Sequence, residues 1–189
     1  AALREWNLQT TIAFDLIKAS IEARSPEVQA PPRHVFLAES PSDLPEFWSR
    51  YGAPTFSCDI ETSCGRITTV GLASSSTHSL VIPFANADGS SYWVDGGQEL
   101  ACWNWLDQLL CNPSHTVIFH NGAYDLQYLY RTLNIRPRAQ FADTMLLHHA
   151  YMPEAERSLH YLGSIYTNVQ AWKQYRRVRA ADKTLKKDD

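Results

Sequence analysis

The chain has 189 residues, of which 44% are hydrophobic and 20% charged, the composition of one ordinary globular domain. It contains no apolar run near the roughly 18 residues that a transmembrane helix needs, and its start lacks the basic flank and apolar block of a signal peptide. The formal net charge of −3 hides an asymmetry, because residues 1–171 carry 10 basic and 17 acidic side chains whereas residues 172–189 carry 7 and 3.

The chain begins with an amphipathic segment over residues 8–24. An apolar stripe runs along one face of this predicted helix and comprises Leu8, Ile12, Leu16, Ile17 and Ile21. A proline-rich stretch follows and predicts a linker. We therefore separate residues 1–32 as an N-terminal helix and linker, which either docks on the main domain or remains from an upstream domain.

Residues 33–171 hold the strands and helices of one α/β domain. The predicted strands cover residues 34–38, 55–61, 67–74, 79–84 and 116–120. The predicted helices cover residues 42–48, 97–111, 122–133, 143–151 and 158–166. Three strands in direct succession predict an antiparallel meander, and the later alternation of helix and strand predicts parallel pairing. The expected fold class is therefore α/β, with a mixed sheet flanked by helices.

Four cysteines occur in the chain, none of them in a CxxC pair. They are Cys58, Cys64, Cys102 and Cys111. Their spacing does not match a zinc ribbon, so we expect free and mostly buried thiols rather than a structural metal site. The three tryptophans Trp93, Trp103 and Trp105 are expected in the core or in a groove wall.

The strand 55–61 places two carboxylates on one face. Successive side chains of a strand point to opposite faces, so Asp59 and Glu61 share a face while Cys58 and Ile60 share the other. Two carboxylates this close repel each other unless a cation neutralises them, and their oxygens suit hard cations such as Mg²⁺ or Mn²⁺. An edge strand with a solvated acidic face would show the same pattern, so both interpretations stay open at this point.

A second acid follows the strand 116–120. Asn121 stands where the next helix should begin and is a favourable N-cap residue. Asp125 falls in the first turns of that helix, where the helix dipole favours negative charge. Capping alone often produces this spacing, so the segment indicates chemistry only together with other motifs.

A third acid, Asp143, precedes an apolar helix. We expect Asp143 to cap that helix and to act as a structural support rather than a metal ligand. His148 and His149 lie on the same helix and are expected to be packing or surface residues.

Taken in order, six segments resemble the 3′–5′ exonuclease (proofreading) domain of family A DNA polymerases, in the DEDD, DnaQ-like superfamily. They are CDIET, VGLA, VIPF, HNGAYDLQYL, FADTML and SLHYLGSIY, within residues 34–166. The resemblance implies a ribonuclease H-like fold and hydrolysis of the 3′-terminal phosphodiester bond, with release of 5′-mononucleotides. A ribonuclease D-like RNA exonuclease shares this metal chemistry and is the alternative.

The resemblance also implies roles for individual residues. The catalytic residues would be Asp59, Glu61 and Asp125, which would hold two divalent cations, Mg²⁺ or Mn²⁺. The substrate groove would be lined by Thr62, His120, Asn121 and Tyr124. Its substrate would be a single-stranded or frayed 3′ end of DNA.

One element of the family pattern is missing from this sequence. The family carries a fourth acid in a YxxxD or HxxxxD motif on a later helix, and no Asp after residue 125 has the required Tyr or His upstream. We therefore expect a fold that lacks its last helix, in a fragment with weak activity or none on its own. The alternative is an inactive nucleic-acid-binding relative.

The segment 172–189 interleaves aromatic and basic side chains. Its residues Lys173, Arg176, Arg177 and Arg179 suit contacts with a nucleic-acid backbone, and a solvated helix is the alternative. By resemblance we expect a polymerase domain downstream in the same protein and no membrane association. The expected location is the replication machinery in the cytoplasm or nucleoid of a bacterial or phage-infected cell.

Overall fold

The computed structural model describes residues 2–22 and 32–167. The chain divides into two compact units, one formed by Ala1–Ala30 with His148–Asp189 and one formed by Pro31–Leu147. We call Pro31–Leu147 the sheet unit. No helix within the described ranges is both long enough and apolar enough to cross a membrane.

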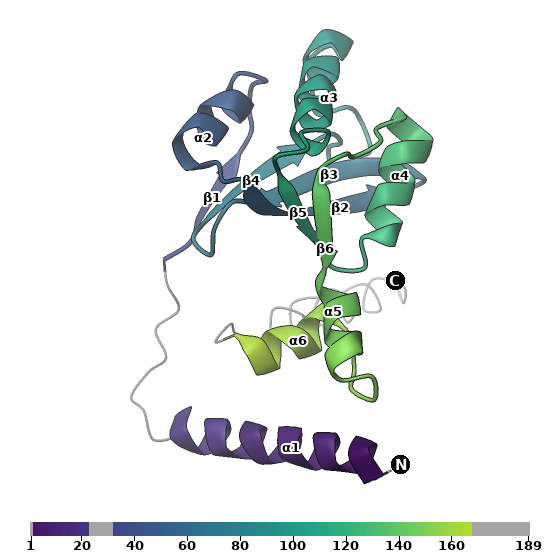
Figure 1. The fold of residues 1–189 in the computed structure, drawn as a ribbon. Coiled ribbons are helices and arrows are strands. Elements are labelled where there is room, and N and C mark those ends of the chain that lie inside the picture. Colours follow the sequence, from purple (N-terminus) through teal and green to yellow (C-terminus); the bar gives the residue numbers. More distant parts are fainter. Residues whose placement is uncertain (1, 23–31, 168–189) are drawn as a thin grey trace, which may run out of the picture. The chain divides into compact units, whose positions relative to one another are not determined.

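The sheet unit is built on a six-stranded mixed sheet (Figure 1). Its strands are β1 (His34–Leu37), β2 (Thr55–Ser63), β3 (Arg66–Ala73), β4 (His78–Pro83), β5 (Thr116–Phe119) and β6 (Gln140–Asp143). They lie in the order β1-β4-β3-β2-β5-β6. Strands β2, β3 and β4 form an antiparallel meander, while β1 pairs in parallel with β4, β5 with β2, and β6 with β5. The predicted mixed sheet is confirmed.

Strand β6 was not predicted from the sequence. It has only four residues and pairs with β5 through Val117–Phe141 and Phe119–Asp143. Phe141 is 62% exposed, so this short strand at the sheet edge has no alternation of buried and exposed side chains to reveal it. Its pairing brings Asp143 to the end of β5.

The turn between β2 and β3 is a two-residue hairpin. Cys64 and Gly65 both have positive φ angles, 50° and 77°, as a type I′ turn requires. Farther along β2 the register shifts between Glu61 and Thr62, and the Thr68 hydroxyl donates a hydrogen bond to the Glu61 carbonyl over 3.1 Å. Such irregularities redirect neighbouring side chains, and this one lies beside a predicted catalytic acid.

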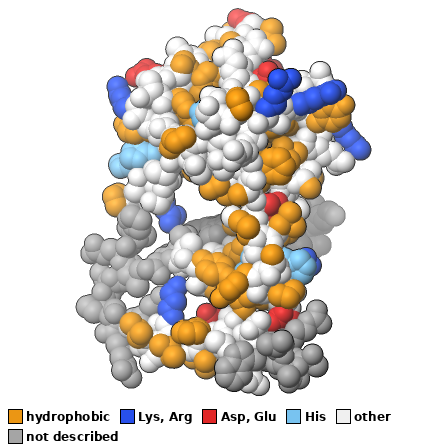
Figure 2. Space-filling view, viewed as in Figure 1, with side chains coloured by type: hydrophobic (Ala, Val, Ile, Leu, Met, Phe, Trp, Pro, Cys, Tyr) orange, Lys and Arg blue, Asp and Glu red, His pale blue; other side chains and the backbone are white. Residues whose placement is uncertain are grey.

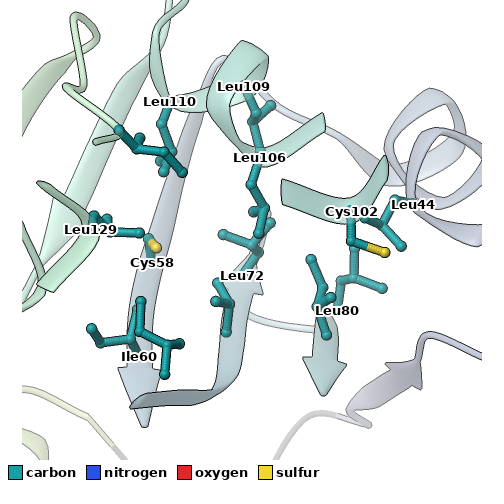
Figure 3. Close-up of a cluster of buried hydrophobic side chains, with 14 of the residues drawn as sticks. Leu44, Cys58, Ile60, Leu72, Leu80, Cys102, Leu106, Leu109, Leu110 and Leu129 are labelled. Atoms are coloured by element: carbon teal, nitrogen blue, oxygen red, sulfur yellow. The ribbon is translucent and has the colours of Figure 1, made fainter. Parts of the chain in front are cut away.

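The helices of the sheet unit share one hydrophobic core with the sheet. They are α2 (Asp43–Tyr51), α3 (Gly96–Leu110) and α4 (Ala123–Leu133). The next helix, α5 (Thr144–Tyr151), is divided between the two units after Leu147, and none of its residues belongs to this core. Figure 3 shows Leu129 of α4 beside Cys58 of β2, and Leu106 of α3 next to Leu72 of β3. Trp103 stacks on Phe84 with ring centroids 3.6 Å apart. This face of the sheet is therefore the buried one.

The tryptophan and cysteine expectations can be compared with the structure directly. Trp93 is buried, and Trp103 and Trp105 pack against the core, which confirms their predicted place. All four cysteines are free, as predicted. Cys64 is exposed, contrary to the expectation of mostly buried thiols, because it occupies the solvent-facing hairpin turn.

The second unit contains α1 (Ala2–Glu22) and α6 (Leu159–Tyr166). The helix α1 begins earlier than the predicted 8–24, and its predicted stripe residues Ile12, Leu16, Ile17 and Ile21 are each at least half exposed. The Thr11 hydroxyl lies 3.6 Å from the Met152 sulfur. His148 is buried, with its Nδ1 3.0 Å from the Tyr166 hydroxyl, so its predicted packing role is confirmed.

Two leucines of α3 that differ in burial give a test of this core. Leu106 is fully buried, whereas Leu100 is 58% exposed. We expect Leu106→Ala to lower the free energy of unfolding by about 2–5 kcal/mol, because it leaves a cavity. Leu100→Ala should change it by no more than about 0.5 kcal/mol. Urea unfolding followed by tryptophan fluorescence measures both, and equal effects would contradict the assigned core.

Candidate active site

Strand β2 presents its two acids on the face opposite the core. Phe56, Cys58 and Ile60 are each at most 5% exposed, whereas Asp59 and Glu61 are exposed. The predicted alternation is confirmed, and it follows from the two-residue period of a strand. Across the ladder, Asp59 pairs with Gly71 and Glu61 with Thr69.

The third acid approaches β2 from α4. Asp125 is only 3% exposed, and its Oδ1 accepts a hydrogen bond from the backbone N–H of Ile60 over 2.9 Å. Strand β5 pairs with β2 only as far as Ser57. Beyond that point the Asp125 carboxylate, instead of β5, accepts the hydrogen bond from the β2 backbone. This contact docks α4 on β2 between Asp59 and Glu61.

The electrostatics of the three acids are coupled. Burial raises the pKa of Asp125 to about 6, and the charges of Asp59 and Asp143 also raise it, against the Ile60 hydrogen bond. Burial and the charge of Glu61 raise the pKa of Asp59, while His120 lowers it. Glu61 therefore makes it harder for Asp59 to ionise, and Asp59 in turn makes it harder for Asp125.

These residues offer the oxygen donors that a hard divalent cation prefers. A cation would also relieve the repulsion that raises the pKa values of Asp59 and Asp125. Within residues 2–22 and 32–167, however, no group of three or more His, Cys, Asp or Glu side chains is arranged so that it could hold a metal ion. The donor set thus suits a cation in its chemistry, and the metal assignment stays a prediction.

The Cys58 thiol lies behind the acids and does not join them. It is buried on the core face, and burial together with the charges of Asp125 and Asp59 strongly raises its pKa. A thiol in this state is neither a nucleophile nor a metal ligand at neutral pH.

The turn between β5 and α4 differs from the prediction. Gly122, not Asn121, is the N-cap of α4 and makes no side-chain cap bond, so the predicted capping role of Asn121 is wrong. Asn121 instead adopts a left-handed conformation with φ 63°. A Cβ on Gly122 would lie 2.5 Å from the Cβ of Phe119, so only glycine fits this turn.

Asp143 supplies the hydrogen bonds that hold the turn. Its carboxylate accepts from the backbone N–H of Gly122 over 2.7 Å and of Asn121 over 3.2 Å. It also accepts from the first turn of α5, at Met145 and Leu146. Burial alone would raise the pKa of Asp143, but these four N–H donors outweigh it and hold that pKa below its usual range. The predicted capping and support role is confirmed.

His120 lies at the same junction. Its Nδ1 is 2.9 Å from the Thr144 hydroxyl, which donates to the Phe119 carbonyl over 3.2 Å. Since His120 also lowers the pKa of Asp59, the ring lies near the acids. Thr144 was missed in the sequence analysis, and the signal for it, a hydroxyl directly after Asp143, becomes informative only once β5 and β6 are paired.

Two further predicted groove residues meet across the end of β2. The Thr62 and Tyr124 hydroxyls lie 2.6 Å apart, and the Tyr124 ring contacts that of Tyr128 with centroids 4.9 Å apart. Tyr124 is 44% exposed, so its ring remains accessible. The basic residues Lys173, Arg176, Arg177 and Arg179 lie outside the described residues.

Comparisons with known proteins identify the family. The model of the DNA_pol_A_exo1 family, described as 3′–5′ exonuclease, matches residues 37–188. A comparison with curated protein sequences gave no match.

Solved structures show the same fold. Trypanosoma brucei RNase D is 18% identical over 78% of this chain and 53% of its own, with a TM-score of 0.59. Escherichia coli RNase D, an exoribonuclease involved in structured RNA processing, is 19% identical over 78% and 36%, with a TM-score of 0.54. Brucella melitensis NrnC is 18% identical over 74% and 61%, with a TM-score of 0.51.

The chain therefore spans 61% or less of each of these neighbours, and at this identity they establish the fold alone. Their DEDD-type exonuclease fold confirms the expected ribonuclease H-like architecture. Because the family model covers most of the sequence, the chain belongs to the DNA_pol_A_exo1 family of 3′–5′ exonuclease domains.

Proposed function

We propose that the chain is the proofreading 3′–5′ exonuclease domain of a DNA polymerase, which removes 5′-mononucleotides from a 3′ end with two divalent metal ions. The observation that carries the proposal is the docking of Asp125 on the Ile60 N–H, between Asp59 and Glu61. Glu61 raises the pKa of Asp59, and Asp59 raises that of Asp125, so a bound cation would relieve this repulsion.

In this proposal the ligands are Asp59, Glu61 and Asp125, and the cations are Mg²⁺ or Mn²⁺. Two such ions, when bound, supply Lewis-acid stabilisation of the attacking and leaving oxygens of a phosphodiester. The contribution of this chain is to hold the carboxylates at fixed positions on β2 and α4, since positioning governs the rate of such reactions.

The remaining site residues orient the end of the substrate. The Thr62–Tyr124 hydroxyl pair offers both a donor and an acceptor to a terminal sugar. The exposed ring of Tyr124 provides a surface on which an unpaired base stacks. Asn121, held in its left-handed turn by Asp143, has an exposed amide that we assign to the same groove. A frayed end is the favoured substrate, because its terminal base costs less to unpair.

The second candidate function is an RNA exonuclease of the RNase D type. It is favoured by the likeness of the fold to Escherichia coli RNase D and to Trypanosoma brucei RNase D, one structure of which is a complex with RNA U12. The two functions share the acids and the metals and differ in the sugar of the substrate. A polymerase domain in the same protein and a place in the replication machinery belong to the first function only.

Metal binding gives a test that does not depend on activity. We expect Mn²⁺ at pH 7.5 to raise the Tm of the wild-type chain, because a ligand that binds the folded state stabilises it. Asp59→Asn and Asp125→Asn should each remove most of this shift. Glu39→Gln, which changes an exposed acid outside the site, should retain it. The metal assignment fails if all four proteins respond alike in differential scanning fluorimetry.

The sugar preference is measured with enzyme in excess, so that slow cleavage is visible. We expect a 5′-labelled single-stranded DNA oligonucleotide in Mn²⁺ to shorten one nucleotide at a time from its 3′ end, faster than RNA of the same sequence. Asp125→Asn should slow cleavage at least about 100-fold, because misplaced reacting groups lose that much. Faster shortening of RNA would select the RNase D-type function instead.

The raised pKa of Asp125 predicts a pH dependence of stability in the absence of metal. The folded chain holds its proton up to about pH 6, whereas an unfolded Asp releases it near pH 4. The unfolding free energy should therefore fall as the pH rises from about 4 to about 6. Asparagine keeps the acceptor for Ile60 without the charge, so Asp125→Asn should gain stability relative to wild type over this range. Urea unfolding at several pH values, with EDTA present, measures the difference; a constant difference would contradict the raised pKa.

A further inference from the structure

One face of α4 leads away from the candidate site, and Tyr128 on this face is half-buried against the core. Tyr124, Tyr128 and Arg131 occupy positions i, i+4 and i+7, which lie on one side of a helix. Tyr124 contacts Thr62 at the site, and Tyr128 contacts Tyr124. Arg131 stands in the last turn of the helix and is exposed. The two tyrosines therefore lead along the helix from the site to a basic residue, Arg131.

The loop after α4 adds two more arginines at fixed positions. It opens at Asn134, which closes the helix in a left-handed conformation with φ 55°. The backbone N–H groups of Arg138 and Ala139 donate to the Leu110 carbonyl, and the Cys111 thiol contacts the Arg136 carbonyl over 3.2 Å. These bonds anchor the loop to the end of α3.

The side chain of Arg136 is itself held in place. Its guanidinium lies 4.8 Å from the centre of the Tyr130 ring and donates to the Tyr130 hydroxyl over 3.1 Å. Tyr130 is uncharged, so these contacts orient the guanidinium without neutralising its positive charge.

The charge of this region contrasts with the rest of the described chain. Residues 126–142 hold three arginines and no Asp or Glu, in a part of the protein that is otherwise acidic. In the described ranges no ion pair engages Arg131, Arg136 or Arg138; the pair found there joins Arg50 to Glu46. Figure 2 shows basic side chains gathered over the C-terminal end of α4. Asp107 at the end of α3 accepts a hydrogen bond from the Cys111 thiol over 3.3 Å.

We infer that Arg131, Arg136 and Arg138, which we call the arginine cluster, bind the phosphate backbone of the substrate strand upstream of its 3′ end; this rests on the proposed function. Arginines that form no ion pair among the described residues are available to phosphates, and the guanidinium of Arg136 is already oriented by Tyr130. From Tyr124 to Arg131 the helix rises roughly 10 Å, and a stacked strand advances about 3.4 Å along its axis per phosphate. The cluster therefore meets the strand about three nucleotides from the end.

Oligonucleotides of two lengths test the inference. The variant Arg131→Gln/Arg136→Gln is compared with Arg33→Gln/Arg50→Gln, which removes the same charge from exposed arginines at the start of β1 and on α2. The probes are labelled 12-nucleotide DNA and RNA strands of one sequence, with Ca²⁺ in place of Mg²⁺, over a range of salt concentrations. A dinucleotide, too short to reach the cluster, is titrated calorimetrically.

We expect the cluster variant to bind both 12-mers roughly tenfold more weakly at 0.1 M salt, with a salt slope shallower by about 1.4, the value for two lost phosphate contacts. Equal losses for DNA and RNA are expected, because the phosphate is common to both. Dinucleotide binding, and 12-mer binding by the Arg33→Gln/Arg50→Gln protein, should match wild type.

Three results would overturn the inference: an unchanged 12-mer affinity in the cluster variant, an equal loss in the comparison variant, or an equal loss for the dinucleotide. In each of these cases the proposed exonuclease function survives, because the wild-type chain still binds the strand. If the wild-type chain binds neither oligonucleotide, the proposed function and the inference fall together.

Discussion

The hydrogen bond from the Ile60 N–H to the Asp125 carboxylate is the contact on which the site depends. It attaches the first turn of α4 to the central strand at the point where β5 no longer pairs with β2. It also brings a buried charge beside Asp59, whose pKa is raised as well. Such an arrangement costs stability unless a cation compensates it. The fold thus brings mutually repelling carboxylates together at the place where a metal-dependent nuclease would bind its cations.

A second carboxylate with the opposite electrostatics supports this contact. Asp143 accepts four backbone N–H groups, and its pKa lies below the usual range. The environment of Asp143 therefore suits a structural hydrogen-bond acceptor, and that of Asp125 suits a metal ligand. Because the Asp143 carboxylate holds Asn121 and Gly122, it fixes where α4 begins and so where Asp125 meets β2. Thr144, next in sequence, orients His120 from the same strand end.

The substrate side of the molecule follows from these two anchors. Tyr124 lies one residue before Asp125, so the helix that delivers the acid also delivers an exposed ring and, two turns later, Arg131. Strand β6 then returns the chain to Asp143, and the loop that precedes it carries Arg136 and Arg138. A single excursion between β5 and β6 therefore contains the acid, the stacking surface and the positive charge. This arrangement is consistent with a domain that binds one strand of DNA or RNA along its backbone up to its 3′ end.

The sequence alone determined the mixed sheet, the facing of Asp59 and Glu61, and the capping role of Asp143, because alternation and capping are local patterns. It also pointed to the exonuclease family through the order of its motifs, and it placed Asp125 on a helix. Only the tertiary structure decided that Asn121 is a left-handed turn residue instead of a cap, that Gln140–Asp143 is a strand, and that Thr144 contacts His120. Each of these depends on β6 lying beside β5, and four residues of which none is buried give no local signal for that pairing. The arginines of the cluster likewise look like ordinary surface residues until α4 and its loop bring them together.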